Sequence, residues 1–198
     1  MARTQSENYP EIRREILRKA AVQFARKGYP NTTIADLAEA NGISRGLLYH
    51  YFGSKEAMLH EMLDTHLDHM LAEVEAAAKI GNSAESRFRN VVRAMVAVNA
   101  GSKDLQIVLL HDLQNLQAAQ RDEIVAKQRA ILAVLRRLIR DNDDVGRTRG
   151  RALKAYTMMV VGMINYTYLW YDPTGPVGPR AYADMVADAC LGDLHRTE

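Results

Sequence analysis

Cysteine is nearly absent from the sequence, because Cys190 is the only one in 198 residues. A single cysteine excludes an internal disulfide framework and is typical of proteins in a reducing compartment. With only five prolines and twelve glycines, the sequence contains too few of these residues for a long flexible linker. Hydrophobic and charged residues, at 47% and 25%, are in proportions ordinary for a globular protein. We therefore expect one or two compact domains.

Long apolar segments are lacking as well. The most apolar run, residues 158–170, is interrupted by Gly162, Asn165 and Thr167, so it is too short and too polar to span a bilayer. The N-terminal residues MARTQSENYPEI contain no apolar core of the kind that a signal peptide needs. These absences predict a soluble, cytoplasmic protein.

Charge is distributed unevenly along the chain. The formal net charge is only +2, but residues 1–55 hold nine Lys or Arg against five acids, a balance of +4. The remaining residues hold 17 basic against 19 acidic side chains, a balance of −2. A basic segment favours contact with a polyanion. The N-terminal end is therefore the candidate for binding nucleic acid.

Residues 10–27 have apolar side chains at three- and four-residue intervals, which predicts an amphipathic helix ending near Gly28. Its other faces carry Arg13, Arg14, Arg18 and Lys19. Two interpretations of these basic residues stay open. They form a solvated surface, or one or two of them lie beside phosphates.

Residues 33–55 contain two short helical patterns joined by a tight turn. Thr33 and Asp36 have the spacing of a capping pair, and Ser44 is placed to cap the second helix. Between them Gly42 is free to adopt a positive φ. This spacing predicts a helix-turn-helix.

In the second of these helices Leu48 and Phe52 lie four residues apart, which predicts a buried side. The opposite side would expose an Arg, a Leu, a His and two Tyr, an unusual surface for a protein without a partner. Arg can pair with guanine or phosphate, Leu can contact a thymine methyl, and Gly46 lets the backbone approach DNA closely. The alternative is an ordinary helical hairpin with surface aromatics. We favour a DNA-reading helix.

Residues 32–59, TTIADLAEANGISRGLLYHYFGSKEAML, resemble the DNA-binding segment of TetR-type bacterial transcriptional regulators. The sequence departs from the family at Asn41, where Ala is typical, and at Leu47, where Thr or Ser is typical. The resemblance implies an all-helical homodimer with a DNA-binding domain and a larger regulatory domain. It also implies a DNA-lining set that comprises Thr33, Ser44, Arg45, Gly46, Leu47, Tyr49, His50, Tyr51 and Lys55.

A long helical pattern runs from Ser54 to about residue 80 and leads out of the DNA-binding segment, so we expect it to be the mechanical link. Its histidines, His60, His66 and His69, lack a second ligand cluster such as CxxC or HExxH. We expect no metal site and no cofactor.

Further amphipathic patterns predict helices at residues 84–100, 103–117, 119–141 and 148–171, with a last helix from about residue 179. The whole pattern predicts an all-α fold of about nine helices, divided into residues 1–53 for DNA binding and residues 54–198 for ligand binding and dimerisation. The 148–171 helix is apolar almost all round, so it must be buried on more than one side. In TetR-type regulators the last two helices pair with those of a second protomer. The resemblance therefore implies a dimer interface at Gly162, Tyr166, Trp170, Tyr182, Val186, Ala189 and Cys190.

The candidate effector-binding residues are His111, Asp112, Asn115, Met159, Met163 and Tyr166. The segments HDLQNLQAAQR and WYDPTGP resemble, more loosely, the TetR-type subgroup that controls acyl-CoA, fatty-acid or steroid catabolism. Acids are scarce among the apolar residues of the candidate cavity. We therefore expect an acyl-CoA or a related lipophilic acid as effector, with a cationic or aromatic drug-like ligand as the alternative.

These patterns together predict a repressor that binds operator DNA as a homodimer and is released by a small molecule. Two other classes compete with it, namely an acyl-thioester enzyme and an adaptor that only dimerises. The sequence has no G-x-S-x-G motif and no visible Cys/His pairing, so we expect no catalytic residues. The expected partners are operator DNA, an effector and a second copy of the chain, with no membrane.

Overall fold

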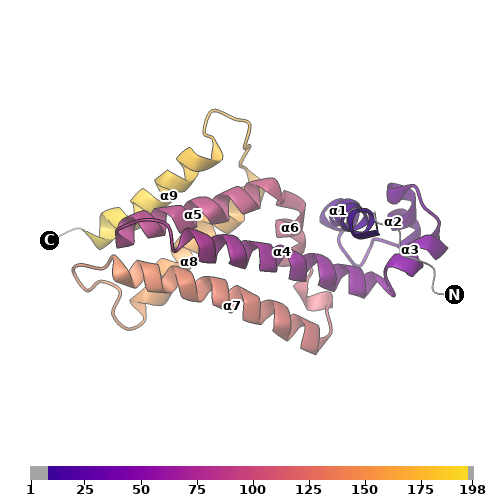
Figure 1. Ribbon diagram of the computed structural model, residues 1–198, viewed down its shortest axis with the longest axis horizontal. Helices are drawn as coiled ribbons and strands as arrows, with labels where there is room; N and C mark the ends of the chain where they lie inside the picture. The colour runs from indigo at the N-terminus through magenta and orange to yellow at the C-terminus, as the bar shows by residue number, and fades with distance from the viewer. Residues whose placement is uncertain (1–8, 196–198) are drawn as a thin grey trace. The chain divides into compact units, whose positions relative to one another are not determined.

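The computed structural model describes residues 9–195. Over that range the chain forms nine α-helices and two short 3-10 helices, with no β-strand (Figure 1). The elements are α1 (Tyr9–Lys27), α2 (Ile34–Asn41), α3 (Arg45–Tyr51), α4 (Lys55–Ala77), α5 (Ala84–Gly101), α6 (Lys103–His111), η1 (Leu113–Asn115), α7 (Ala118–Asp141), α8 (Ala152–Asn165), η2 (Tyr166–Leu169) and α9 (Pro179–Leu194). The predicted all-α class is confirmed.

The chain divides into two compact units. The first unit contains the residues up to His66 together with Asp104–Glu123, and the second contains Leu67–Lys103 and the residues from Ile124 onward. Helices α4 and α7 contribute residues to both. The division at residues 53 and 54 that we predict from the sequence concerns function, and we retain it as a proposal.

The first unit is built around the buried faces of its first four helices. Its core side chains are Ile16, Leu17, Ala20, Ala21 and Phe24 of α1, Leu37 and Ala38 of α2, Leu48 and Phe52 at α3, and Met58, Leu59, Met62 and Leu63 of α4. Leu48 and Phe52 are only 1% and 2% exposed. The side of α3 predicted to face the core does so.

The start of α2 has the capping box that the sequence predicts. Thr33 Oγ1 accepts from the backbone N–H of Asp36 at 3.1 Å, while the Asp36 carboxylate accepts from the Thr33 N–H at 2.8 Å. The hydrogen bond from Lys27, together with those from Thr33, holds the pKa of Asp36 well below its usual range. Two of the N–H groups that a helix start leaves unpaired are thereby satisfied.

The turn between α2 and α3 depends on a glycine. Gly42 has φ +66°, and its N–H donates to Glu39 O at 3.0 Å. Ser44 then caps α3 by accepting from the Leu47 N–H at 3.1 Å. Only glycine adopts this left-handed conformation without a steric cost, so the sharp angle between the two helices requires it here.

The core of the second unit lies largely between α5 and α9, which run side by side (Figure 1). The buried side chains include Phe88, Val91, Val92, Met95 and Val96 of α5 and Ala183, Val186, Ala187, Cys190, Leu191 and Leu194 of α9. Arg93 forms an ion pair with Asp184 at 2.7 Å across the same helices. Burial raises the pKa of the Cys190 thiol to about 12, so the thiolate is scarce at neutral pH.

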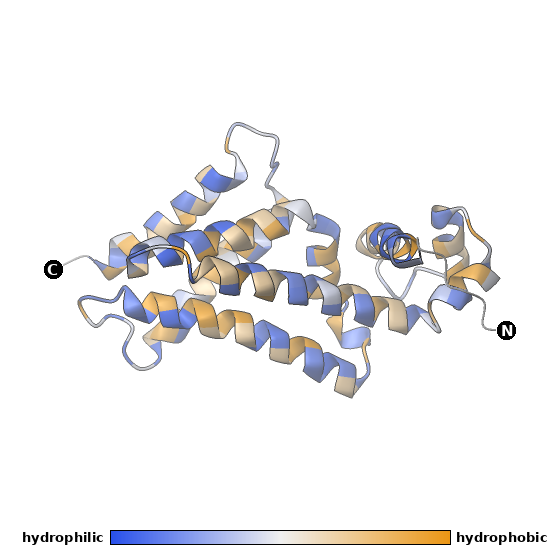
Figure 2. Cartoon of the chain, in the orientation of Figure 1, coloured by the Kyte–Doolittle hydropathy of each residue, from blue (hydrophilic) through white to orange (hydrophobic). Residues whose placement is uncertain are grey.

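Figure 2 shows apolar and polar residues alternating along α7, as an amphipathic helix requires. Its buried residues are Ile124, Ile131, Leu135, Leu138 and Ile139. Within the described residues, none of the helices has both the length and the apolar character needed to cross a bilayer.

Three helices are shorter than the sequence patterns predict. Helix α4 ends at Ala77, α6 ends at His111, and α8 gives way to the 3-10 helix η2 after Asn165. In η2 the Thr167 hydroxyl donates to the Ile164 carbonyl at 2.7 Å, a local bond of the kind that competes with α-helical pairing. Apolar periodicity continues through these ends, which is why the patterns overestimate the lengths.

Replacing Gly42 by Ala should lower the stability of the protein. A Cβ at Gly42 has no atom within 4 Å, so the expected loss of about 1–2 kcal/mol comes from backbone strain alone. Gly192→Ala is the matched control, because that site in α9 is equally open and has no positive φ. There the change should stabilise by roughly 0.5–1 kcal/mol. Thermal unfolding of both variants measures the difference, and equal shifts would contradict the strain.

Candidate nucleic-acid interface

Helix α3 presents one face to solvent and the other to the core. Beside buried Leu48, the side chains of Leu47 and Tyr49 are 42% and 52% exposed. The exposed members of the predicted DNA-lining set are Thr33, Ser44, Arg45, Gly46, Leu47, Tyr49 and His50. Tyr51 is half-buried and stacks on Tyr9 with ring centroids 4.9 Å apart. The structure therefore brings seven of the nine predicted residues to the surface around α3.

Arg13 of α1 fixes the end of α3. Its Nε donates to Glu61 Oε1 at 2.6 Å, and a second guanidinium nitrogen donates to the carbonyl of Tyr51. The guanidinium also lies 4.2 Å from the centre of the Phe52 ring. Hydrogen bonding to Glu61 raises the pKa of Arg13. The Arg13 guanidinium is therefore engaged within the first unit, although its side chain remains 30% exposed.

Lys55 is in the predicted DNA-lining set, and that role stays a prediction; in this structure its side chain contacts the chain between α1 and α2. Its ammonium donates to the carbonyls of Tyr29 and Thr32, at 2.8 and 2.9 Å, and lies 4.2 Å from the centre of the Tyr29 ring. Burial lowers the pKa of Lys55. The side chain thus ties the start of α4 to the α1–α2 connection, residues 28–33.

Asp112 reaches the same connection from the end of α6. The residue is 6% exposed, and both carboxylate oxygens lie 3.4 Å from the Tyr29 backbone nitrogen, whose N–H they accept. Asn115 Nδ2 donates to the same carboxylate at 3.3 Å. Burial raises the pKa of Asp112, although the Tyr29 N–H opposes the shift.

Two of the predicted effector residues therefore have an internal structural role in the first unit. Asp112 and Asn115 bond to each other, whereas His111 is exposed at the end of α6. The bond from Tyr29 to Asp112 joins residues 83 positions apart. Helical spacing cannot reveal such a bond, and the only signal in the sequence is an acid within an otherwise apolar stretch.

The other predicted effector residues lie on α8 and η2 in the second unit. Met159 and Tyr166 are 41% and 58% exposed, and Met163 is intermediate. We use the name α8–α9 surface for the exposed large apolar residues of α8, of η2 with the residue after it, and of α9, which are Met158, Met159, Tyr166, Leu169, Trp170 and Met185.

The predicted dimer residues fall into two groups. Gly162, Tyr166, Trp170 and Ala189 are exposed or partly exposed. Tyr182, Val186 and Cys190 are 9%, 2% and 0% exposed within the protomer, and the Tyr182 hydroxyl donates to the carbonyl of Met163 at 2.6 Å. This second group packs in the core of its own chain, because α9 presents that face to α5.

One polar residue that the sequence patterns do not single out is buried in the second unit. Asn99 of α5 is 4% exposed, and within the described residues neither its Nδ2 nor its Oδ1 has a hydrogen-bond partner. An amide left unpaired in the interior costs about 1–3 kcal/mol. Such a group is a candidate contact for a bound molecule.

Known proteins resemble this chain over both units. The family model described as "Bacterial regulatory proteins, tetR family" matches residues 16–62, and "Tetracyclin repressor-like, C-terminal domain" matches residues 81–194. A TetR-family transcriptional regulator from Bordetella parapertussis 12822 is 38% identical, with a TM-score of 0.85 over 91% of this chain and 94% of that chain.

Two further relatives extend the comparison. The HTH-type transcriptional repressor KstR2 of Rhodococcus jostii (strain RHA1) is 31% identical over 109 residues, which is 55% of this chain and 53% of KstR2. The chain thus matches about half the length of that relative. AibR, solved in complex with isovaleryl coenzyme A and operator DNA, shares the fold at 23% identity, with a TM-score of 0.77 over 90% of this chain and 97% of that chain.

The C-terminal model alone covers more than half of the 198 residues, and the N-terminal model covers the helix-turn-helix. The chain belongs to the TetR family of bacterial transcriptional regulators.

Proposed function

We propose that the protein is a homodimeric repressor that binds operator DNA through α3 and leaves it when a lipophilic, acyl-CoA-like effector binds. The observation that carries the proposal is the solvent-facing side of α3, where a short helix anchored by Leu48 and Phe52 exposes polar and aromatic groups. A helix of this kind fits the major groove of DNA.

The exposed groups of α3 suit DNA chemically. Arg45 has a guanidinium fork that matches a guanine edge or a phosphate, and the Tyr49 hydroxyl can donate to phosphate. Leu47 supplies an apolar contact for a thymine methyl. At Gly46 a Cβ would meet only Ser44 Oγ, at 3.9 Å, so the backbone there is open to close approach.

Dimerisation is proposed through the α8–α9 surface. Leu169 and Trp170 are 65% and 62% exposed, and exposed apolar residues gathered in this way mark interaction surfaces. A two-fold interface would place two α3 helices about 34–36 Å apart, one turn of DNA.

The α1–α2 connection is the proposed point at which α6 acts on the reading helices. Lys55 of α4 and Asp112 after α6 both hold the backbone of Tyr29. A displacement of the end of α6 therefore pulls on a segment that leads directly into α2. The effector can shift the DNA-binding equilibrium only by its difference in affinity for the two conformations.

The effector class is proposed from the interior of the second unit. The unpaired amide of Asn99 offers both a donor and an acceptor to a ligand carbonyl or amide. The structure of AibR with isovaleryl coenzyme A and operator DNA shows that this fold can hold an acyl-CoA in that protein. The side-chain N–H of Asn99 can donate to the oxygen of a thioester or an acid, whereas a cation offers no acceptor for that N–H.

Arg45→Ala should weaken operator binding by about 1–3 kcal/mol, because it removes one charge-assisted contact to DNA. Arg18→Ala is the charge-matched control. Arg18 donates to the Glu15 carboxylate at 2.7 Å and is attracted electrostatically by Asp104, so acids of its own unit already engage its charge. Fluorescence anisotropy with operator DNA at several salt concentrations measures both. Equal losses of operator affinity in the two variants would contradict the assignment of α3 as the helix that reads the DNA.

Leu169→Glu should convert the dimer to monomer and weaken binding to a two-half-site operator, because it places a charge in the α8–α9 surface. Ile80→Glu is the control, since Ile80 is 62% exposed, close to the 65% of Leu169, and lies outside that surface. Sedimentation velocity gives the oligomeric state. A dimeric Leu169→Glu protein would place the interface elsewhere.

Asp112→Ala should speed hydrogen exchange at the Tyr29 amide by about tenfold, because the net value of the lost hydrogen bond is about 1 kcal/mol or slightly more. Asp112→Asn retains an oxygen acceptor of the same shape and should exchange nearly as the wild type does. Amide exchange followed by NMR or mass spectrometry resolves the difference. Identical rates in all three proteins would show that Asp112 does not hold the connection.

A further inference from the structure

His50 stands at the middle of the solvent-facing side of α3. It follows buried Leu48 by two residues, so it projects about 200° from Leu48 around the helix axis, nearly opposite the core. Leu47 and Tyr49 each lie about 100° from Leu48, one to either side. His50 is therefore the side chain of α3 that points most directly away from the first unit, and the contacts proposed above give it no role.

The imidazole of His50 has an aromatic neighbour and lies beside bare backbone. Gly46 is one turn earlier in α3, and a Cβ there would meet only Ser44 Oγ, at 3.9 Å. Side chains of an α-helix lean toward its N-terminus, which directs the imidazole over the turn that contains Gly46. The ring of Tyr51 contacts the imidazole edge to face, with centroids 5.9 Å apart, and Tyr51 in turn stacks on Tyr9. A DNA groove can thus come close to an imidazole whose position is restrained.

The acids near α3 do not pair with His50. Helix α3 itself contains no acid. On the neighbouring helices, Asp36 bonds Lys27 at 2.8 Å, and Glu61 bonds Arg13 at 2.6 Å. In the part of the chain that the structure describes, no acid bonds His50, so an imidazolium at this position has no counter-ion of its own. The titratable and charged groups of α3 and of the helices packed with it are Tyr9 and Arg13 of α1, Asp36 and Glu39 of α2, Arg45, Tyr49 and Tyr51 of α3, and Lys55, Glu56 and Glu61 of α4.

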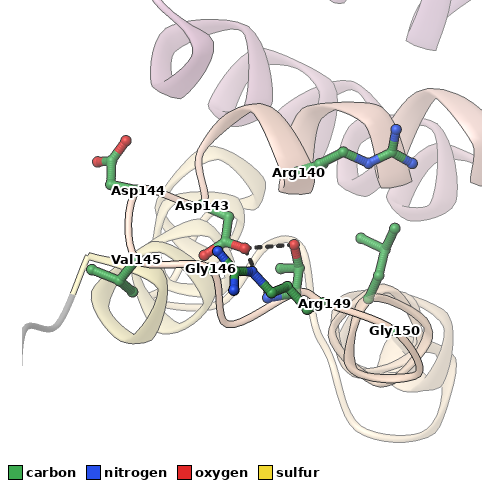
Figure 3. Close-up of a pocket in the computed structure, with 9 residues that line it drawn as sticks. Arg140, Asp143, Asp144, Val145, Gly146, Arg149 and Gly150 are labelled. Carbon is green, nitrogen blue, oxygen red and sulfur yellow. Dashed lines mark hydrogen bonds between the residues drawn. The ribbon is translucent and has the colours of Figure 1, made fainter.

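A second set of exposed cations lies at the α7–α8 loop (residues 142–151) and does not converge. Figure 3 shows the guanidinium groups of Arg140 and Arg149 directed away from each other at an open surface hollow. No single ligand is therefore addressed by both of them. His50 differs, because it shares a solvent-facing side with groups that suit DNA.

Histidine changes charge near neutral pH, and its two forms present different hydrogen-bonding groups. The imidazolium donates from both ring nitrogens, whereas the neutral imidazole has one donor and one acceptor. In the major groove guanine presents two adjacent acceptors, N7 and O6, while thymine presents one, and adenine and cytosine each present an amino donor. A group that only donates therefore fits guanine best, and the negative potential of DNA favours the charged form.

We propose that His50 reads a guanine in each operator half-site as an imidazolium, so that operator binding takes up protons. The inference rests on the proposed binding of DNA through α3, and it names the base and the protonation state at the centre of that contact. Because the bound state then holds more protons than the free state, operator affinity rises as the pH falls. The proton comes from solvent and stays on the imidazole, and no covalent bond to carbon changes.

The probe is a duplex that the full-length protein selects from a randomised DNA library at about pH 6, where an imidazole is largely protonated. Its affinity, measured by fluorescence anisotropy at constant ionic strength, should fall at least about tenfold between about pH 6 and about pH 8, because two charge-assisted contacts are lost per dimer. His50→Gln should bind this duplex weakly and with little dependence on pH. His50→Arg, which carries a permanent charge, should bind more tightly than His50→Gln and also show little dependence on pH.

His69→Gln is the matched control, because His69 is an exposed histidine of α4 and lies outside α3. This variant should keep the affinity and the pH profile of the wild type. Circular dichroism establishes that the variants keep the helical fold, which changes of exposed side chains should preserve. If His50→Gln has the same pH profile as the wild type, the inference is overturned.

Replacing a guanine of the selected duplex by 7-deazaguanine removes its N7 acceptor and so tests the base. At one guanine per half-site this change should weaken wild-type binding about tenfold at low pH but weaken His50→Gln by less than about threefold, since that variant has already lost the contact. Equal weakening of the two proteins at every guanine also overturns the inference. A wild-type protein that selects no duplex at all contradicts operator binding itself, whereas normal selection with an unchanged His50→Gln profile contradicts only the role of His50.

Discussion

The α1–α2 connection is held by two charges of opposite sign, one on the half-buried Lys55 and one on the buried Asp112, and the placement of the reading helices depends on it. Lys55 binds two of its carbonyls and Asp112 accepts its Tyr29 N–H. Both groups sit where burial disfavours their charged forms, as the lowered pKa of Lys55 and the raised pKa of Asp112 show. Partly desolvated charges tolerate little displacement, because moving either one leaves a polar group unpaired. The connection is therefore held in place both by the attraction in these bonds and by the free-energy cost of leaving either charged group without its partner.

Helix α6 belongs to the same compact unit as the helix-turn-helix, which the order of the elements along the chain does not suggest. Residues 104–123 pack with the helix-turn-helix, although more than 35 residues separate them from His66 in the chain. Arg13 completes the same unit by joining α1, the end of α3 and α4. A change at the end of α6 thus reaches α3 through bonded side chains within one compact body. In the proposed coupling, a displacement of the end of α6 can therefore act on α3 without a prior movement of α4 as a whole.

Local features of the fold could be predicted from the sequence, and long-range ones could not. The cap at Thr33, the turn at Gly42 and the burial of Leu48 each depend on residues within a few positions, which spacing reveals. Lys55 matches a family position, yet spacing does not say that its ammonium turns inward to Tyr29. Apolar periodicity likewise marks Val186 as buried without saying whether α5 of the same chain or a partner covers it. The DNA-binding assignments remain predictions about the exposed residues of α3.

The burial of Cys190 has a practical consequence. Its side chain is 0% exposed and its thiol has a pKa of about 12, so it reacts poorly with oxidants and maleimides at neutral pH. The native chain therefore behaves chemically as a cysteine-free protein while it is folded. A cysteine placed at an exposed site would be the only reactive thiol per protomer. In a two-fold dimer that gives one symmetric pair of labels, and a single distance between them would report how far apart the two reading helices lie.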